Sequence, residues 1–194
     1  WKTESQTGEP LAGAKLQIIE KESGEIGYEF DTTEEPHNSR GLKLRTEEEE
    51  HIYILHEDKP ADGYVTAEDI EFKLLQAVDE EGQLLTRADV YVLKNIEEEQ
   101  PEDEKASILE QILSWAGVKG QTDKAWVKVS DETVVMEDDI TKIDISKADI
   151  AGEELPGAHL VVKDEEGTIV DEWDSTEEPH RIEGIKPGEY TLTE

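Results

Sequence analysis

The sequence contains one pattern twice, in the same order. Residues 31–37 read Asp-Thr-Thr-Glu-Glu-Pro-His, and residues 174–180 read Asp-Ser-Thr-Glu-Glu-Pro-His. Two further blocks recur around this one: 11–14 as 155–158, and, more loosely, 52–57 as 189–194. Matched blocks in a constant order indicate a tandem array of two copies. The chain starts at Trp1 and its second copy reaches only the third block, so we expect a segment of a longer protein whose second copy is incomplete at its C-terminus.

The balance of charge limits the classes of partner. The chain has 51 acidic and 19 basic residues, a formal net charge of -32. Nucleic acids and anionic membranes are bound through basic surfaces, so we expect neither as a partner. The absence of cysteine excludes disulfides, thiol catalysis and thiolate metal sites. No apolar run approaches the length of about 18 residues that suggests a membrane span, so we expect no membrane insertion in this segment.

Short alternating segments separated by turns dominate the chain. In residues 14–20 Leu16 and Ile18 share one face, and in 69–75 Ile70, Phe72 and Leu74 do. The other expected strands are 52–57, 134–136, 142–147, 158–163, 169–173 and 190–194. Turn pairs such as Asp62-Gly63 and Glu166-Gly167 separate them. This pattern predicts an all-β fold of tandem antiparallel sandwiches, with one domain at 1–141 and a second at 142–194.

One stretch has helical spacing instead. Between Pro101 and Ala116 the apolar residues Ile108, Ile112 and Ala116 recur every four positions, with Leu109 and Leu113 beside them. Pro, Glu and Asp at the start and Gly117 at the end are typical helix boundaries. We therefore predict an amphipathic helical insert at about 97–117 within the first domain. Its apolar face either covers the sandwich or docks a partner.

The usual signatures of catalysis are missing. The sequence has neither a Gly-x-Ser-x-Gly elbow nor a glycine-rich phosphate loop. The five histidines form no His-x-His or His-x-x-x-His pair, and no twelve-residue calcium loop is present. We therefore expect no enzyme activity, no cofactor and no metal site.

A series of motifs does resemble a known family. The second copy contains Ile145-Ser146-Lys147, Glu154-Leu155-Pro156-Gly157-Ala158, Trp173-Asp174-Ser175-Thr176 and the run from Gly184 to Glu194; the first contains Lys2, 7–14, 53–57 and 60–64. In this order they resemble the Cna B-type domain, also called the SpaA-type or prealbumin-like domain of Gram-positive surface proteins and pilins. The resemblance covers the chain except for roughly residues 77–124.

The resemblance implies a prealbumin-like or Ig-like sandwich that carries an intramolecular isopeptide bond. In this family a lysine on the first strand joins an Asn or Asp on the last strand, and a Glu on a middle strand assists. Carried over, these roles fall on Lys2, Asp138 and Glu57 in the first domain. In the second domain Lys147 and Glu194 match the lysine and the glutamate. Burial would favour the neutral, nucleophilic form of a lysine, and a buried Glu can shuttle protons.

The sequence therefore predicts a stalk or adhesin module of a Gram-positive surface protein. The location implied is extracellular and attached to the cell wall, with neighbouring repeat domains as partners. One alternative is a module that binds a host protein or glycan through the insert or loops, where Trp115 and Trp126 would be the aromatic contacts. Another is an accessory part of a surface enzyme whose catalytic domain lies elsewhere.

Overall fold

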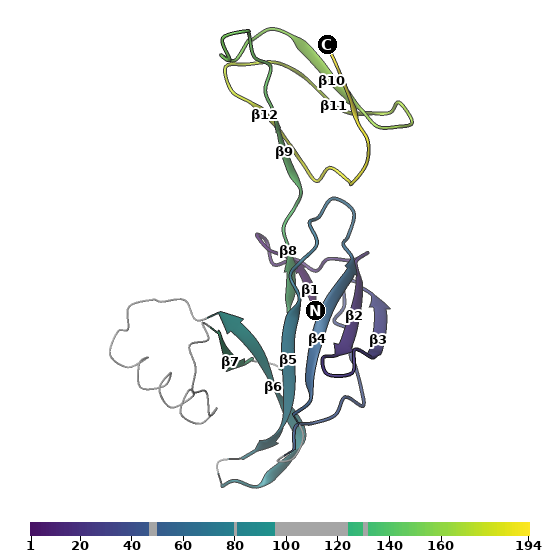
Figure 1. Ribbon diagram of the computed structural model, residues 1–194, viewed down its shortest axis with the longest axis vertical. Helices are drawn as coiled ribbons and strands as arrows, with labels where there is room; N and C mark the ends of the chain where they lie inside the picture. The colour runs from purple at the N-terminus through teal and green to yellow at the C-terminus, as the bar shows by residue number, and fades with distance from the viewer. Residues whose placement is uncertain (47–49, 80, 96–123, 130–131) are drawn as a thin grey trace, which may run out of the picture.

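The chain forms an elongated all-β structure with two lobes (Figure 1). The computed structural model describes residues 1–46, 50–79, 81–95, 124–129 and 132–194. The strands are β1 Lys2–Glu4, β2 Lys15–Glu20, β3 Ile26–Asp31, β4 Ile52–Lys59, β5 Ile70–Val78, β6 Leu84–Asn95, β7 Lys124–Lys128, β8 Met136–Asp138, β9 Lys142–Ile145, β10 His159–Lys163, β11 Ile169–Asp174, β12 His180–Glu183 and β13 Thr191–Thr193.

A six-stranded antiparallel sheet forms one layer of the N-terminal lobe. Its strand order is β3-β2-β4-β5-β6-β7. Because side chains alternate across a strand, each strand sends every second residue to one common face. Inward residues of β2, β4, β5 and β6 make most of the core cluster, namely Leu16, Ile18, Tyr53, Leu55, Phe72, Val90 and Val92. Met136 of β8 completes it.

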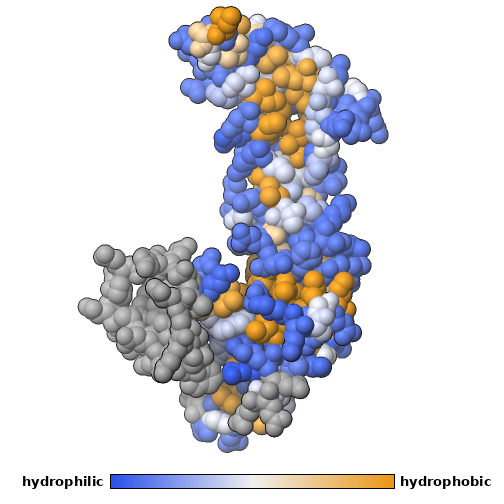
Figure 2. All heavy atoms as spheres, in the orientation of Figure 1, coloured by the Kyte–Doolittle hydropathy of each residue, from blue (hydrophilic) through white to orange (hydrophobic). Residues whose placement is uncertain are grey.

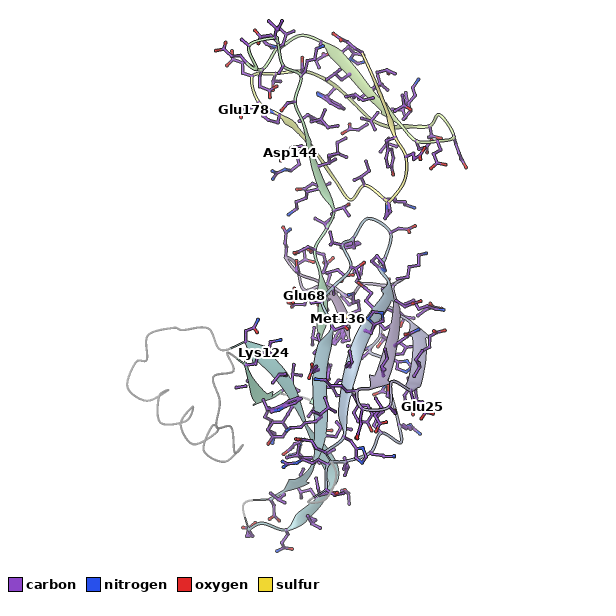
Figure 3. The ribbon with its side chains drawn as sticks, in the orientation of Figure 1. Glu25, Glu68, Lys124, Met136, Asp144 and Glu178 are labelled. Atoms are coloured by element: carbon purple, nitrogen blue, oxygen red, sulfur yellow. The ribbon has the colours of Figure 1, made fainter. Side chains whose placement is uncertain are left out.

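The second layer of this lobe contains a short pair, β1 and β8. The two strands are parallel, with Lys2 opposite Met136 and Glu4 opposite Asp138. The expectation of a purely antiparallel sandwich was therefore wrong at this pair. A parallel pair needs a long crossover, and here the whole six-stranded sheet lies between the two strands in sequence. Met136 has no exposed surface, and its side chain lies inside the lobe (Figure 3).

The C-terminal lobe has two small sheets of its own. One has the order β11-β10-β13, the other pairs β12 with β9, and neither shares a strand with the N-terminal lobe. Its buried large apolar residues are Leu160, Val162 and Ile182, whereas others such as Ile169 and Leu192 are about half exposed. Apolar side chains accordingly appear on its surface among the hydrophilic majority (Figure 2). This lobe therefore has a much smaller core than the N-terminal one.

The all-β prediction is confirmed, and the predicted strands appear with shifted ends. The alternating pattern missed five strands: β1, β3, β6, β7 and β12. Of these, the family resemblance alone had placed Lys2 on a first strand. Part of β6 does alternate, with Val90 and Val92 inward, but mixed polar residues in its first half conceal the pattern. The described residues contain no α-helix, and the predicted insert at 97–117 lies outside them. Within the described part of the chain, no helix has the length and apolar character of a membrane span.

Candidate functional site

Three charged side chains meet in the interior of the N-terminal lobe. Lys2 opens β1, Asp138 closes β8, and Glu57 belongs to β4. Glu57 follows Tyr53 and Leu55 at every second position, so the alternation of β4 points it into the core. The exposed fractions of Lys2, Glu57 and Asp138 are 2%, 2% and 0%. Charged side chains are rarely buried to this extent unless they are paired.

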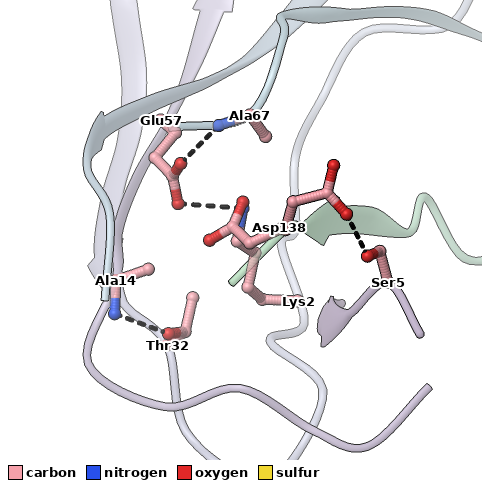
Figure 4. Close-up of polar contacts among 8 residues, drawn as sticks. Lys2, Ser5, Ala14, Thr32, Glu57, Ala67 and Asp138 are labelled. Atoms are coloured by element: carbon pink, nitrogen blue, oxygen red, sulfur yellow. Dashed lines mark hydrogen bonds and ion pairs between the residues drawn. The ribbon is translucent and has the colours of Figure 1, made fainter. Parts of the chain in front are cut away.

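The three groups contact one another directly (Figure 4). Lys2 Nζ lies 2.8 Å from Glu57 Oε1 and donates a hydrogen bond to Asp138 Oδ1. The other oxygen of Glu57, Oε2, accepts the backbone N–H of Ala67 at 2.8 Å. That bond fixes the Glu57 carboxylate, whose Oε1 then faces the lysine. The amine is therefore held between two carboxylates that come from different strands.

One carboxyl group of the cluster is electrostatically perturbed. Burial raises the pKa of Asp138 from 3.8 to about 6. The negative charge of Glu57 also raises this pKa, whereas the Lys2 ammonium lowers it. Asp138 Oδ2 is buried and has no hydrogen-bond partner among the described residues. This oxygen is therefore the natural place for a proton, and protonation would relieve the burial of two negative charges beside one positive charge.

A neutral lysine beside a protonated carboxyl group is a pair that can condense to an amide. In such a condensation the nitrogen would attack the Asp138 carboxyl carbon, an N–C bond would form, and the C–O bond to the hydroxyl would break with release of water. Glu57 is placed to accept a proton from the attacking nitrogen and to return it to the departing oxygen. Fixed neighbours of this kind react with very high effective molarity, because the entropic cost of their encounter is already met by folding.

The second predicted site, Lys147 and Glu194, is more exposed than the Lys2 cluster and contains fewer charged groups. Lys147 Nζ lies 2.9 Å from Glu194 Oε2, and these are the lysine and glutamate that the family resemblance paired. Their side chains are 27% and 58% exposed, so water screens the interaction. Among the described residues, no second carboxylate pairs with Lys147. The structure therefore brings together the lysine and the glutamate there, without a counterpart of Asp138.

The sequence pattern did not identify three residues whose hydrogen bonds support the two lobes, Ala67, Thr32 and Ser175. Ala67 acts through its backbone N–H, for which no side-chain pattern exists. Thr32 and Ser175, in contrast, occupy the same place in the repeated Asp-Thr-Thr and Asp-Ser-Thr blocks. Thr32 Oγ1 accepts the backbone N–H of Ala14 at 3.0 Å, and Ser175 Oγ accepts that of Ala158 at 2.9 Å. The repetition of a hydroxyl at this position was the available signal.

The histidines and tryptophans considered in the sequence analysis contact neighbouring side chains where the structure describes them. His37 stacks on Phe30 and His180 on Trp173, with ring centroids 3.7 Å and 4.1 Å apart. Trp126 lies on β7, where Lys73 Nζ sits 4.2 Å from its ring centroid, and Trp115 lies outside the described residues. In the part of the chain that the structure describes, no cluster of three or more metal-ligating side chains occurs.

This fold and cluster define an all-β sandwich that buries a lysine with two carboxylates. A family model identifies the class: the description is the SpaA prealbumin-like fold domain, and it matches residues 1–87 and 141–194. The chain belongs to this family. The two matched stretches include both Lys–Glu pairs, whereas Asp138 lies between them.

Several solved structures show weaker likeness. The major pilin subunit BcpA of Bacillus cereus, in a D312A variant, is 16% identical, with 98% of this chain and 85% of that chain covered and a TM-score of 0.28. The Bacillus anthracis TIE protein is 14% identical, with 98% and 43% covered and a TM-score of 0.24. The pilus adhesin SpaC of Lactobacillus rhamnosus GG is 12% identical, with 99% and 23% covered and a TM-score of 0.31. A search of curated proteins finds no match.

Proposed function

We propose that this chain is a structural stalk or adhesin module of a Gram-positive cell-surface protein, stabilised by an isopeptide bond between Lys2 and Asp138. The single observation that carries the proposal is the direct contact of the Lys2 amine with the Asp138 carboxyl group in a fully buried site. Family membership supports the same role. The module works outside the cell, attached to the cell wall, with neighbouring repeat domains as its partners.

The proposed units are two sandwich domains, 1–141 and 142–194. Separate hydrogen-bonded sheets on either side of Thr141 support this division. The first unit carries the 96–123 segment between β6 and β7, where Asn95 pairs with Lys124. Because the two ends of that segment are paired, an insertion there leaves the sheet register intact.

The position of the proposed bond suits a protein under tension. Lys2 and Asp138 are separated by 136 residues, nearly the whole first domain. A bond between them carries a pulling force directly from β1 to β8. The sheet and core between the two strands are then not loaded, because the covalent path is shorter than the folded one. In a stalk without cysteines, this bond would provide the resistance to mechanical unfolding that disulfides cannot supply.

Intact mass spectrometry of the purified chain tests the proposal. The expected mass is that of the sequence less one water, and digestion should yield a branched peptide that joins Lys2 to Asp138. Lys2→Met should show the full mass. Asp138→Asn is the matched variant, because an amide electrophile releases ammonia instead of water. The proposal would be contradicted if the parent chain had the mass of its unmodified sequence and if Lys2 reacted with amine reagents after denaturation.

A further inference from the structure

Thr141, the residue between the two lobes, is held from both sides. Its backbone N–H donates to the carbonyl oxygen of Gly63 at 2.9 Å, and its own carbonyl accepts the N–H of Gly184 at 2.8 Å. Its hydroxyl lies 3.0 Å from the Gly63 oxygen and 2.7 Å from the Ile185 oxygen. Gly63 belongs to the N-terminal lobe and Gly184 to the C-terminal lobe. One residue therefore hydrogen-bonds to both, through its backbone and its side chain.

Two glycines allow the lobes to approach this closely. Gly63 has φ +87° and Gly184 has φ +70°, the left-handed region that favours glycine. A Cβ atom on Gly63 would lie 2.7 Å from the carbonyl oxygen of Gly184, which is a clash with backbone. The turn of one lobe thus packs against the turn of the other with no space for a side chain on Gly63.

Residues on either side extend the contact. Ile140 forms a β-bridge with Tyr64, and the N–H of Val65 donates to the carbonyl of Asp139 at 2.8 Å. Lys186 Nζ pairs with Asp62 Oδ2 at 2.9 Å across the lobes. That ion pair is well exposed and contributes little, so the backbone contacts determine the geometry.

We infer that this joint, formed by the 62–65 turn, Thr141 and the 184–186 turn, locks the two lobes into one rigid body. A flexible linker would leave its peptide groups to water, whereas here the connecting residues hydrogen-bond with both neighbours. Bending at Thr141 would break these bonds and separate the glycines. The joint transmits orientation from one repeat to the next, which keeps an array straight. This inference does not depend on whether the Lys2–Asp138 bond forms.

Spin-label distance measurements test the joint. The chain has no cysteine, so labels attach only at Glu25→Cys and Glu178→Cys, two exposed positions in different lobes (Figure 3). The doubly labelled chain without further substitution should give one narrow distribution of distances between the two labels. Gly63→Ala should broaden it, because the new methyl group forces the turns apart. A broad distribution in the parent, or an equally narrow one in Gly63→Ala, would overturn the inference.

The matched control is Gly24→Ala. Gly24 has φ +71° in the β2–β3 turn, and a Cβ there would meet nothing within 4 Å. It therefore carries the same kind of backbone strain without the contact, and its distribution should stay narrow. If Gly63→Ala does not fold, as circular dichroism would show, Thr141→Val is used instead. It removes the hydroxyl bonds, keeps a similar shape and should also broaden the distribution, and an unchanged width would count against the joint.

Discussion

The backbone N–H of Leu155 donates to the carbonyl oxygen of Lys147, at 2.6 Å. Leu11 makes the same bond to Lys2, at 3.0 Å. Because each leucine opens its Leu-x-Gly-Ala block, this bond establishes that Lys147 is the structural counterpart of Lys2. Each of these lysines also pairs with a glutamate, at 2.9 Å and 2.8 Å respectively. The two repeats therefore present the same amine in the same backbone setting, but among the described residues only the first places an aspartate beside it.

The exposed pair in the second repeat should react with a supplied aspartate. We expect a peptide with the sequence of residues 132–139 to add as a strand beside Lys147 and to form an amide with it, because the peptide carries the missing carboxyl group. Mass spectrometry should detect the peptide mass less one water on the chain. The controls are a peptide with Asp138→Ala and a chain with Lys147→Met, and an adduct in either control would refute the assignment.

Loss of the Glu57 carboxylate should prevent the cross-link in the first repeat. We expect Glu57→Ala to fold but to keep its full mass, because no group remains to move the proton between nitrogen and oxygen. Without the bond, the unfolded chain recovers the entropy of a 136-residue loop, about 5 kcal/mol by analogy with a disulfide. Calorimetry should show that the midpoint of thermal unfolding of Glu57→Ala is lower than that of the parent chain by about 10–20 °C.

The conservative variant separates chemistry from packing. Glu57→Gln keeps an acceptor for the Ala67 N–H but cannot act as a base, so it should also retain the full mass. Glu25→Gln, on the surface, should cross-link as the parent does. If Glu57→Gln still loses water, the proton transfer belongs to another group.

The uncross-linked fold should be less stable at neutral than at mildly acidic pH. Burial raises the pKa of Asp138 from 3.8 to about 6, so between these values the folded chain binds more protons than the unfolded chain. Its stabilising contribution is complete below pH 3.8 and is lost as the pH rises through about 6. Lys2→Met cannot cross-link and also removes the ammonium that lowers this pKa, so its loss of stability extends to higher pH. The variant should therefore lose thermal stability as the pH rises above 3.8.

Repulsion among the many acidic side chains of this chain also changes over this pH range. The pH dependence of Lys2→Met therefore needs a reference variant. Adding Asp138→Asn to Lys2→Met removes the titrating group and leaves the surface charge otherwise intact. The double variant should show a smaller change as the pH rises from about 4 to neutrality. Equal pH dependence in both variants would show that Asp138 does not titrate in this range.

The repeated hydroxyl should stabilise each repeat in the same way. Thr32→Val leaves the buried N–H of Ala14 without its acceptor, at an expected cost of about 1–3 kcal/mol. Thr32→Ser should restore most of that loss, because Ser175 performs the same function in the second repeat. Urea unfolding measures both variants, and a Thr32→Val chain as stable as the parent would show that the bond is dispensable.

Local sequence pattern predicts much of this fold. Alternation located most strands, because the backbone geometry of a strand imposes a period of two on buried residues. The repeat aligned the block of Thr32 with that of Ser175, without revealing their hydrogen bonds. The family resemblance assigned the roles of Lys2, Glu57, Asp138, Lys147 and Glu194. The helix at 101–116 stays a prediction from its spacing.

Only the tertiary structure decided which of these residues meet. Nothing in the alternation of β1 or β8 specifies that they pair in parallel, since strand pairing depends on the path of the intervening chain. Burial of Lys2 and Asp138 follows from that pairing and from the sheet that covers it. The contact of Gly63 with Gly184 is also invisible in the sequence, where both look like ordinary turn glycines. A sequence determines local conformation and the faces of strands, whereas close contacts between distant segments arise from the packing of the whole chain.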